Sequence, residues 1–271
     1  MDYQNWSNIK IPYAILDRAF LEGTNFSSAN LDHVRFYQTC LTKVHFTNAS
    51  MNNIYFGEYA NLEGHSDLVL GIQFLPDRSK VVSYSCDRTI RIWDIASSNQ
   101  LCVLKGHSDD INGVQFSHDG SKIVLSSSLD NTIRIWDVSS GEQVNLLYGH
   151  SGSVNTVQFS PDYSKIVSCS RDESVRIWDA SSGTQLQLLE GHFNDVVGVH
   201  FTSNGLNIIS YSKDATIRIW DVVSGQQIQI LEGHTENING IQFSPDGSKI
   251  LSYSGDNTLR LWDLLSGKQL Q

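Results

Sequence analysis

The chain has 271 residues, and its 29 acidic side chains against 19 basic ones give a formal charge of −10. An acidic chain without a basic patch is a poor match for the phosphate backbone, so we expect no nucleic-acid partner. The start Met1-Asp2-Tyr3-Gln4-Asn5 is polar, and no apolar run approaches the roughly 18 residues of a membrane span. We therefore expect no membrane partner and an intracellular protein, cytoplasmic or nuclear, that is not secreted.

A period of five residues runs through the N-terminal part of the chain. Apolar side chains recur at every fifth position from Ile11 to Phe56, and a small or β-branched residue precedes most of them by two positions. Neither the helical period of 3.6 nor the strand period of 2 gives this spacing. We therefore predict a square coil with one pentapeptide per side, in which Phe36 points inward and Arg35 outward.

Segments such as Ala29-Asn30-Leu31-Asp32-His33 resemble the repeating unit of pentapeptide-repeat proteins. The resemblance implies a short right-handed parallel β-helix over residues 9–61, with four pentapeptides per coil, after an N-terminal lead-in of residues 1–8. A solenoid this short buries little apolar surface and needs its ends covered.

A second period, of 42 or 43 residues, covers residues 62–271. Five Gly-His pairs, beginning with Gly64-His65, are each followed by a Trp-Asp pair, beginning with Trp93-Asp94. Turns such as Ser244-Pro245-Asp246-Gly247 separate short runs of β-branched residues. A repeat of this length and punctuation is typical of four-stranded β-propeller blades. The five predicted repeats are residues 62–104, 105–147, 148–189, 190–231 and 232–271.

These residues resemble the WD-repeat (WD40) family. The resemblance implies an all-β fold and, in each blade, a buried tetrad of His, Ser or Thr, Asp and Trp. Carried over, the tetrads are His65, Ser83, Asp87 and Trp93; His107, Ser126, Asp130 and Trp136; His150, Ser168, Asp172 and Trp178; His192, Ser210, Asp214 and Trp220; and His234, Ser252, Asp256 and Trp262. Which serine joins stays open, because a second one follows two residues later, at Ser85, Ser128, Ser170, Ser212 and Ser254.

A Ser/His/Asp set that recurs five times at one spacing is typical of scaffolding. Catalysis would need an accessible nucleophile and an oxyanion hole. We therefore predict no catalytic residues and no enzyme activity. The chain has no GxxxxGKS/T loop, no HExxH and no EF-hand pattern, so we expect no cofactor. Its cysteines, Cys40, Cys86, Cys102 and Cys169, form no CxxC pair, which favours free thiols and no metal site.

The WD-repeat resemblance also implies a partner-binding face around the central channel. Its variable positions lie three and five residues after each His and one before each turn Asp. In this chain they are Leu68, Leu70 and Cys86; Asp110, Asn112 and Leu129; Ser153, Asn155 and Arg171; Asp195, Val197 and Lys213; and Asn237, Asn239 and Gly255. The set contains no aromatic residue and a single Arg, which argues against one tight anchor peptide.

The leading hypothesis is a non-enzymatic scaffold that presents a propeller face to other proteins or peptides. One alternative is the sensor or regulatory repeat tail of a larger signalling NTPase, whose nucleotide-binding module would lie upstream of Met1. Another is a hydrolase that uses one repeated Ser/His/Asp set.

Ring closure is the remaining question. Propellers of this family usually close with about seven blades, and Lys268-Gln269-Leu270-Gln271 stops within a fourth strand. We expect an incomplete propeller whose unpaired edges favour self-association. Alternatively, Tyr59-Ala60-Asn61-Leu62 closes a five-bladed ring.

Overall fold

The computed structural model describes residues 4–56, 61–75, 79–95, 97–117 and 123–270. Within them the chain is all-β, as predicted. It divides into two compact units, Met1–Glu63 with Ala96–Ser98, and Gly64–Ile95 with Asn99–Gln271. No helix in these described ranges has the length and apolar character needed to cross a membrane.

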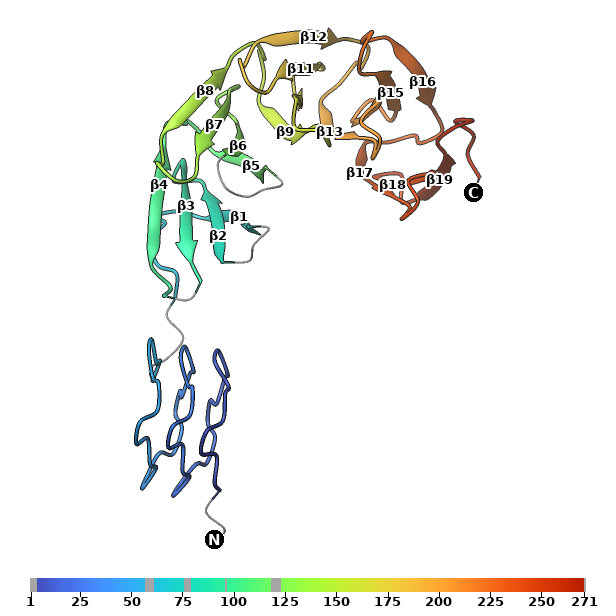
Figure 1. Ribbon diagram of the computed structural model, residues 1–271. Coiled ribbons are helices and arrows are strands. Elements are labelled where there is room, and N and C mark those ends of the chain that lie inside the picture. The colour runs from blue at the N-terminus through green and yellow to red at the C-terminus, as the bar shows by residue number, and fades with distance from the viewer. Residues whose placement is uncertain (1–3, 57–60, 76–78, 96, 118–122, 271) are drawn as a thin grey trace. The chain divides into compact units, whose positions relative to one another are not determined.

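The N-terminal unit is a coil whose backbone repeats every four pentapeptides. Isolated parallel bridges join positions such as Asn5 and Asn25, Lys10 and Asn30, and Arg35 and Tyr55, and Figure 1 shows the successive coils in blue. Each bridge continues into backbone hydrogen bonds, such as Trp6 N to Asn25 O at 2.8 Å. The right-handed β-helix implied by the resemblance stays a prediction that rests on this coil repeat.

The corners of the coil explain why a period of five forms it. One residue in each pentapeptide adopts a left-handed φ between 51° and 71°, and the next side begins after a turn such as Ile9 N to Trp6 O, 3.3 Å. Left-handed backbone turns the chain sharply, which neither a helix nor a strand permits. The corner residues are Asn8, Tyr13, Arg18, Gly23, Ser28, His33, Gln38, Lys43, Asn48 and Asn53.

The interior of the coil is an apolar column. Phe26, Leu31 and Phe36 are almost completely buried, and Phe26 stacks on Phe46 with ring centroids 5.6 Å apart. Trp6 extends this column, because its ring meets the ring of Phe26 edge-on at 5.3 Å. The coil thus starts at Asn5 and Trp6, inside the segment that the sequence assigned to a lead-in.

Arg35 lies on the outer surface of the coil but is not free. Its Nε donates a hydrogen bond of 2.9 Å to Oδ1 of Asp17, and a second guanidinium nitrogen contacts Oδ2 of the same carboxylate. A paired guanidinium and carboxylate hold two adjacent coils together. An outward position alone would predict that Arg35→Asp is tolerated, but this substitution would remove the pair with Asp17 and place two carboxylates together.

The register of the coil predicts which substitutions it tolerates. Phe36→Asp should unfold the N-terminal unit, because even Phe-to-Ala truncation in a core costs about 3–5 kcal/mol and a buried carboxylate costs more. Thr47→Asp, at an exposed position, is the matched control and should leave the unit intact. Limited proteolysis followed by mass spectrometry checks both; equal protection of the two variants would contradict the register.

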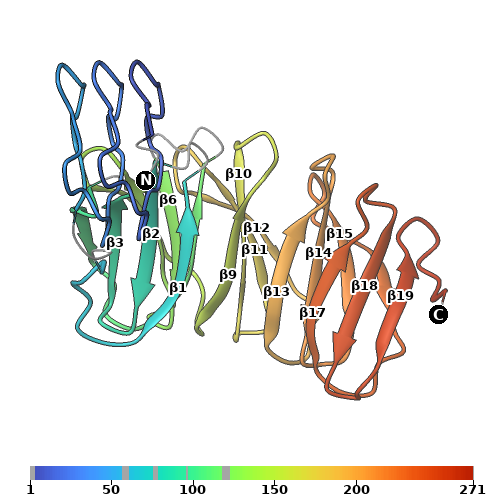
Figure 2. The same cartoon turned by 90° about the horizontal axis from the view of Figure 1, so that it is seen from below.

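The C-terminal unit consists of antiparallel sheets built from strands that follow one another in the chain (Figures 1 and 2). Five such sheets lie within the described residues, which confirms the predicted five blades. The first blade contains β1 (Val69–Phe74), β2 (Lys80–Ser85), β3 (Thr89–Asp94) and β4 (Gln100–Lys105). The second contains β5 (Ile111–Phe116), β6 (Ile123–Ser128), β7 (Ile133–Asp137) and β8 (Gln143–Leu147).

The third and fourth blades repeat this order, and the fifth has its first three strands. The third contains β9 (Val154–Phe159), β10 (Lys165–Ser170), β11 (Val175–Asp179) and β12 (Gln185–Leu189). The fourth contains β13 (Val196–Phe201), β14 (Asn207–Ser212), β15 (Ile217–Asp221) and β16 (Gln227–Leu231). The fifth contains β17 (Ile238–Phe243), β18 (Lys249–Ser254) and β19 (Leu259–Asp263).

The fifth sheet has the order β17-β18-β19, and its described strands all come from the last repeat. Beyond β19 the chain forms an isolated bridge between Trp262 and Gln269. The alternative in which Tyr59-Ala60-Asn61-Leu62 closes the ring falls partly outside the described residues, since Tyr59 and Ala60 are not among them.

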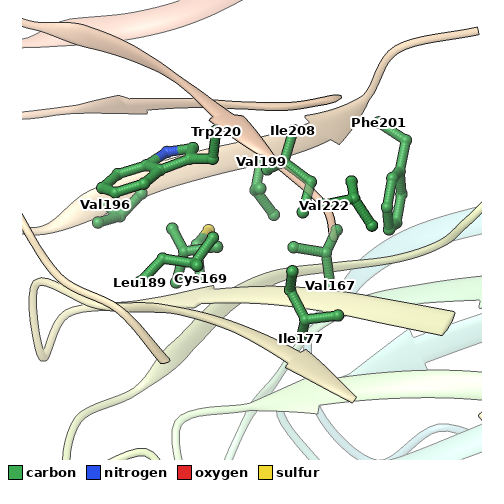
Figure 3. Close-up of a cluster of buried hydrophobic side chains, with 11 residues drawn as sticks. Val167, Cys169, Ile177, Leu189, Val196, Val199, Phe201, Ile208, Trp220 and Val222 are labelled. Carbon is green, nitrogen blue, oxygen red and sulfur yellow. The ribbon is translucent and has the colours of Figure 1, made fainter. Parts of the chain in front are cut away.

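Neighbouring blades pack face to face through apolar side chains. We call the side of a blade that meets the preceding blade its leading face, and the side that meets the following blade its trailing face. Figure 3 shows the trailing face of the third blade, with Val167, Cys169 and Ile177, against the leading face of the fourth. That leading face carries Val196, Val199, Phe201 and Ile208. Burial of such side chains is the main stabilising contribution to the unit.

Candidate functional site

The predicted tetrad residues of each blade lie in one hydrogen-bonded chain. In the first blade Nδ1 of His65 lies 2.8 Å from Oδ2 of Asp87, and Nε2 lies 2.7 Å from Oγ of Ser83. The indole N–H of Trp93 donates to the same Oγ at 2.8 Å. These hydrogen bonds therefore join the Gly-His turn, β2, β3 and the turn between those two strands.

The same geometry recurs in the other four blades. Each His lies 2.7–2.9 Å from its Asp and 2.7–2.8 Å from its Ser, and each indole lies 2.8–2.9 Å from that Ser. The hydroxyl that joins is the first of the two candidates, so Ser83 and not Ser85 completes the first tetrad. Ser85 instead accepts the backbone N–H of Asp87 at 3.0 Å and donates to Asp67 O.

The donors and acceptors along this hydrogen-bonded chain fit one continuous order. An indole N–H can only donate, so Ser Oγ accepts from Trp, and in this order the hydroxyl gives its proton to Nε2 of His. Nδ1 then carries the imidazole proton and donates it to the Asp carboxylate. The histidine in this order is neutral, and its two nitrogens have opposite roles.

A fifth residue takes part that the sequence reasoning missed. Thr89 Oγ1 donates to Oδ1 of Asp87 at 2.6 Å, and the backbone N–H of Thr89 donates to the same oxygen at 2.9 Å. A Thr or Ser two residues after each turn Asp was the available signal. The equivalents are Thr132, Ser174, Thr216 and Thr258.

Hydrogen bonding and burial set the charge states of these side chains. Burial by itself raises the pKa of Asp172, but the hydrogen bonds from His150 and Ser174 outweigh it and hold that pKa well below the usual range. Burial lowers the pKa of His150 and of His192, although the neighbouring carboxylates oppose this shift. The His150–Asp172 and His192–Asp214 pairs therefore consist of a carboxylate and a neutral imidazole near pH 7.

The tetrads should matter for stability. Asp172→Ala should lower the free energy of unfolding by about 2–4 kcal/mol, because it leaves His150 and Ser174 without a buried partner. Glu190→Ala, at an exposed position, is the control and should change it by less than about 0.5 kcal/mol. Urea unfolding of the two variants measures the difference, and an unchanged midpoint for Asp172→Ala would rule out a structural role.

The lowered histidine pKa values also predict a pH dependence. An unfolded histidine binds a proton with its ordinary pKa of 6.5, whereas burial lowers the pKa of folded His150 and His192. Their contribution to stability is thus complete above pH 6.5 and is lost as the pH falls from 6.5 toward the lower folded pKa. The urea midpoint should decrease from pH 7.5 to 5.5, with a shallower decrease in His150→Gln. A midpoint that stays level or rises on acidification would contradict this sign.

The tetrads lack the features of a catalytic site. Ser168 is completely buried, and its hydroxyl is already shared between Trp178 and His150. A nucleophile must reach its substrate, so this hydroxyl is unsuited to attack. Among the residues that the structure describes, no three His, Cys, Asp or Glu side chains gather as metal ligands would.

The predicted partner-face positions gather at one end of the blades, where each first strand begins and each second strand ends. In every blade the position three after the His accepts a backbone hydrogen bond from the position before the turn Asp. Examples are Cys86 N to Leu68 O and Lys213 N to Asp195 O, at 2.9 and 3.0 Å. We call the predicted positions, together with Phe193, the loop-end surface.

Several of these side chains contact other residues instead of standing free. Asn112 Nδ2 donates to Val154 O at 2.8 Å, and Asn155 Nδ2 donates to Val196 O at 2.7 Å, so both asparagines tie their blade to the next. Lys213 pairs with Asp195 at 2.9 Å. Leu68, Arg171 and Asn237 are exposed.

Phe193 is the aromatic residue that the sequence reasoning missed on this surface. It follows His192 directly, where the other repeats have Ser or Thr, and its side chain is 81% exposed. The Arg218 guanidinium lies 5.5 Å from the centre of its ring, within the range of a cation–π interaction. An exposed aromatic residue at a position that is small and polar elsewhere was the available signal.

Comparison with known proteins accounts for both repeats. The family model described as "WD domain, G-beta repeat" matches residues 57–94, 98–137, 141–179, 183–221 and 225–263. The model described as "Pentapeptide repeats (8 copies)" matches residues 13–42. Both resemblances seen in the sequence are thereby confirmed.

Among curated proteins, Striatin-4 of Homo sapiens is 48% identical over 42 residues, which make up 16% of this chain and 6% of that protein. Striatin-4 of Mus musculus gives the same figures. The chain thus spans 6% of the length of these relatives, and the similarity has the length of one repeat.

Proposed function

Because the chain belongs to the WD40 family of WD domain, G-beta repeats, we propose that it is a protein-interaction scaffold whose loop-end surface binds a protein or peptide. Repeats of this family are in general non-enzymatic. The short Striatin-4 similarity agrees with the repeat and adds no partner, because it covers a single repeat.

One observation carries this proposal: the constant and the variable residues of the repeats lie in different places. In each blade the Ser and Trp are buried, the side chains of the His and Asp are at most 6% exposed, and the four are bonded to one another. The loop-end positions differ from blade to blade, and Leu68, Phe193 and Lys213 are exposed there. Surface positions that vary within a constant framework are suited to recognition rather than to stability.

The composition of the surface supports a protein or peptide ligand. Phe193 and Arg171 belong to the residue types that dominate binding hot spots. Phe193 belongs to the fourth blade and Arg171 to the neighbouring third blade. Lys213 already forms an ion pair with Asp195. Among the described loop-end positions of these two blades, Arg171 is therefore the exposed charged side chain that is available to a ligand. An apolar or aromatic side chain together with a carboxylate is the ligand chemistry that this pair accommodates.

The hydrolase alternative is disfavoured by the same geometry. Each of the five serines is buried or nearly so and accepts an indole N–H. Because the serine hydroxyl is bonded in the same way in all five blades, none of the five serines is placed to act as a nucleophile.

A double variant tests the proposal. Phe193→Ser with Arg171→Glu should reduce, by about tenfold or more, the partner proteins captured by the purified chain from an extract of the cells that make it. Val223→Ser with Lys268→Glu is the matched control, because Val223 is also 81% exposed and Lys268 is exposed at the opposite end of the blades. Quantitative mass spectrometry of the captured proteins compares the variants with the wild type.

Loss of the same proteins from both variants, or from neither, would contradict binding at the loop-end surface. Cross-linking of a captured protein to residues near Phe193 would place it directly. Both variants change exposed positions, so equal melting temperatures are expected and serve as the folding control.

A further inference from the structure

The two blades at the ends of the row expose the faces that all other blades bury. On the leading face of the first blade, Ile72 and Phe74 are 68% and 61% exposed, whereas the matching Val157 and Phe159 of the third blade are both 7% exposed. Contiguous apolar surface of this kind is uncommon on a monomer and marks an interaction site.

The trailing face of the fifth blade is open in the same way. Tyr253 and Leu259 are 50% and 65% exposed, whereas the matching Cys169 and Val175 of the third blade are completely buried. Inside the unit, this face always packs against a leading face, as between the fourth and fifth blades, where Ile217 and Ile219 pack with Ile238 and Ile250. The surface that fits an open trailing face is therefore a leading face.

Two polar side chains of the fifth blade also indicate that a leading face binds there. From the second to the third blade and from the third to the fourth, an Asn and a Gln of one blade bind the backbone of the next. In the second of these pairs, Asn155 Nδ2 donates to Val196 O at 2.7 Å, and Gln158 Oε1 accepts from Phe201 N at 2.8 Å.

The fifth blade carries the same two residues, Asn239 and Gln242, and both are exposed. The fourth blade, which has its neighbour within the chain, carries Val197 and His200 at these positions. In the first blade, the residues that match Val196 and Phe201 are Val69 and Phe74, on its open leading face.

We propose that the trailing face of the fifth blade binds the leading face of the first blade in a second copy of this chain, so that copies associate head to tail. Leu251, Tyr253 and Leu259 of one copy pack on Val69, Ile72 and Phe74 of the other. Asn239 donates to Val69 O, and Gln242 accepts from Phe74 N, as their counterparts do inside the unit. The contact joins two different surfaces, so it is heterologous. Further copies can therefore add to a dimer until the assembly closes into a ring.

The proposal concerns the end faces, which share only Asn239 with the loop-end surface, and the purified chain tests it without any partner. Sedimentation velocity or light scattering from about 1 to 100 μM should show masses above that of the monomer that increase with concentration. Phe74→Asp and Leu259→Asp should each weaken association by about 100-fold, because each places a carboxylate in an apolar contact. Leu265→Asp, at an exposed turn position of the fifth blade, is the control and should associate like the wild type.

Mixing the two variants makes the test specific for a head-to-tail contact. Phe74→Asp keeps an intact trailing face and Leu259→Asp an intact leading face, so the mixture should form one-to-one dimers and stop there. Asn239→Ala with Gln242→Ala adds no charge and should weaken wild-type association by about tenfold.

Three results would overturn the proposal. A chain that stays monomeric throughout this range shows that the end faces do not bind a second copy. Association that survives both aspartate variants uses a different surface. Loss of association in each variant without dimers in the mixture rules out the head-to-tail arrangement.

Discussion

Each blade depends on a buried network of hydrogen bonds. The indole N–H of β3 can only donate, so the serine oxygen accepts from it, the histidine joins that hydroxyl to the turn, and a carboxylate in the turn binds Nδ1 of the histidine. Because all members are buried, each missing partner leaves an unsatisfied polar group, and the four segments that supply them cannot shift independently. This constraint explains why the blades are so alike, and it leaves recognition to residues that do not take part in these hydrogen bonds.

The two periods of the sequence were sufficient to predict the five blades, the coil and the buried column around Phe36, because apolar spacing decides which side chains face inward. The serine that joins each tetrad could not be predicted. Ser83 and Ser85 lie two residues apart on one strand, so both face the same side of the sheet, and only the register of β2 against β3 distinguishes them. Trp6 was missed because the polar residues around it conceal a position that continues the five-residue register.

The environment of the end blades is also invisible in the sequence. Ile72 and Val157 are similar side chains at matching positions, yet one is exposed and the other buried. A repeat pattern records which face of a strand is apolar, whereas burial depends on whether another blade lies against that face. Arg35 shows the same limit on a smaller scale, since its position in the register gives its direction but not its pairing with Asp17.

The consecutive order of strands in every sheet has a consequence for how the protein acquires its structure. The described strands of each sheet come from one repeat, and no sheet among them mixes strands from distant repeats. Closing short loops costs little chain entropy, so every blade forms from its own segment and then gains stability from the neighbour on either side. This topology allows folding to begin in any blade and to spread to its neighbours.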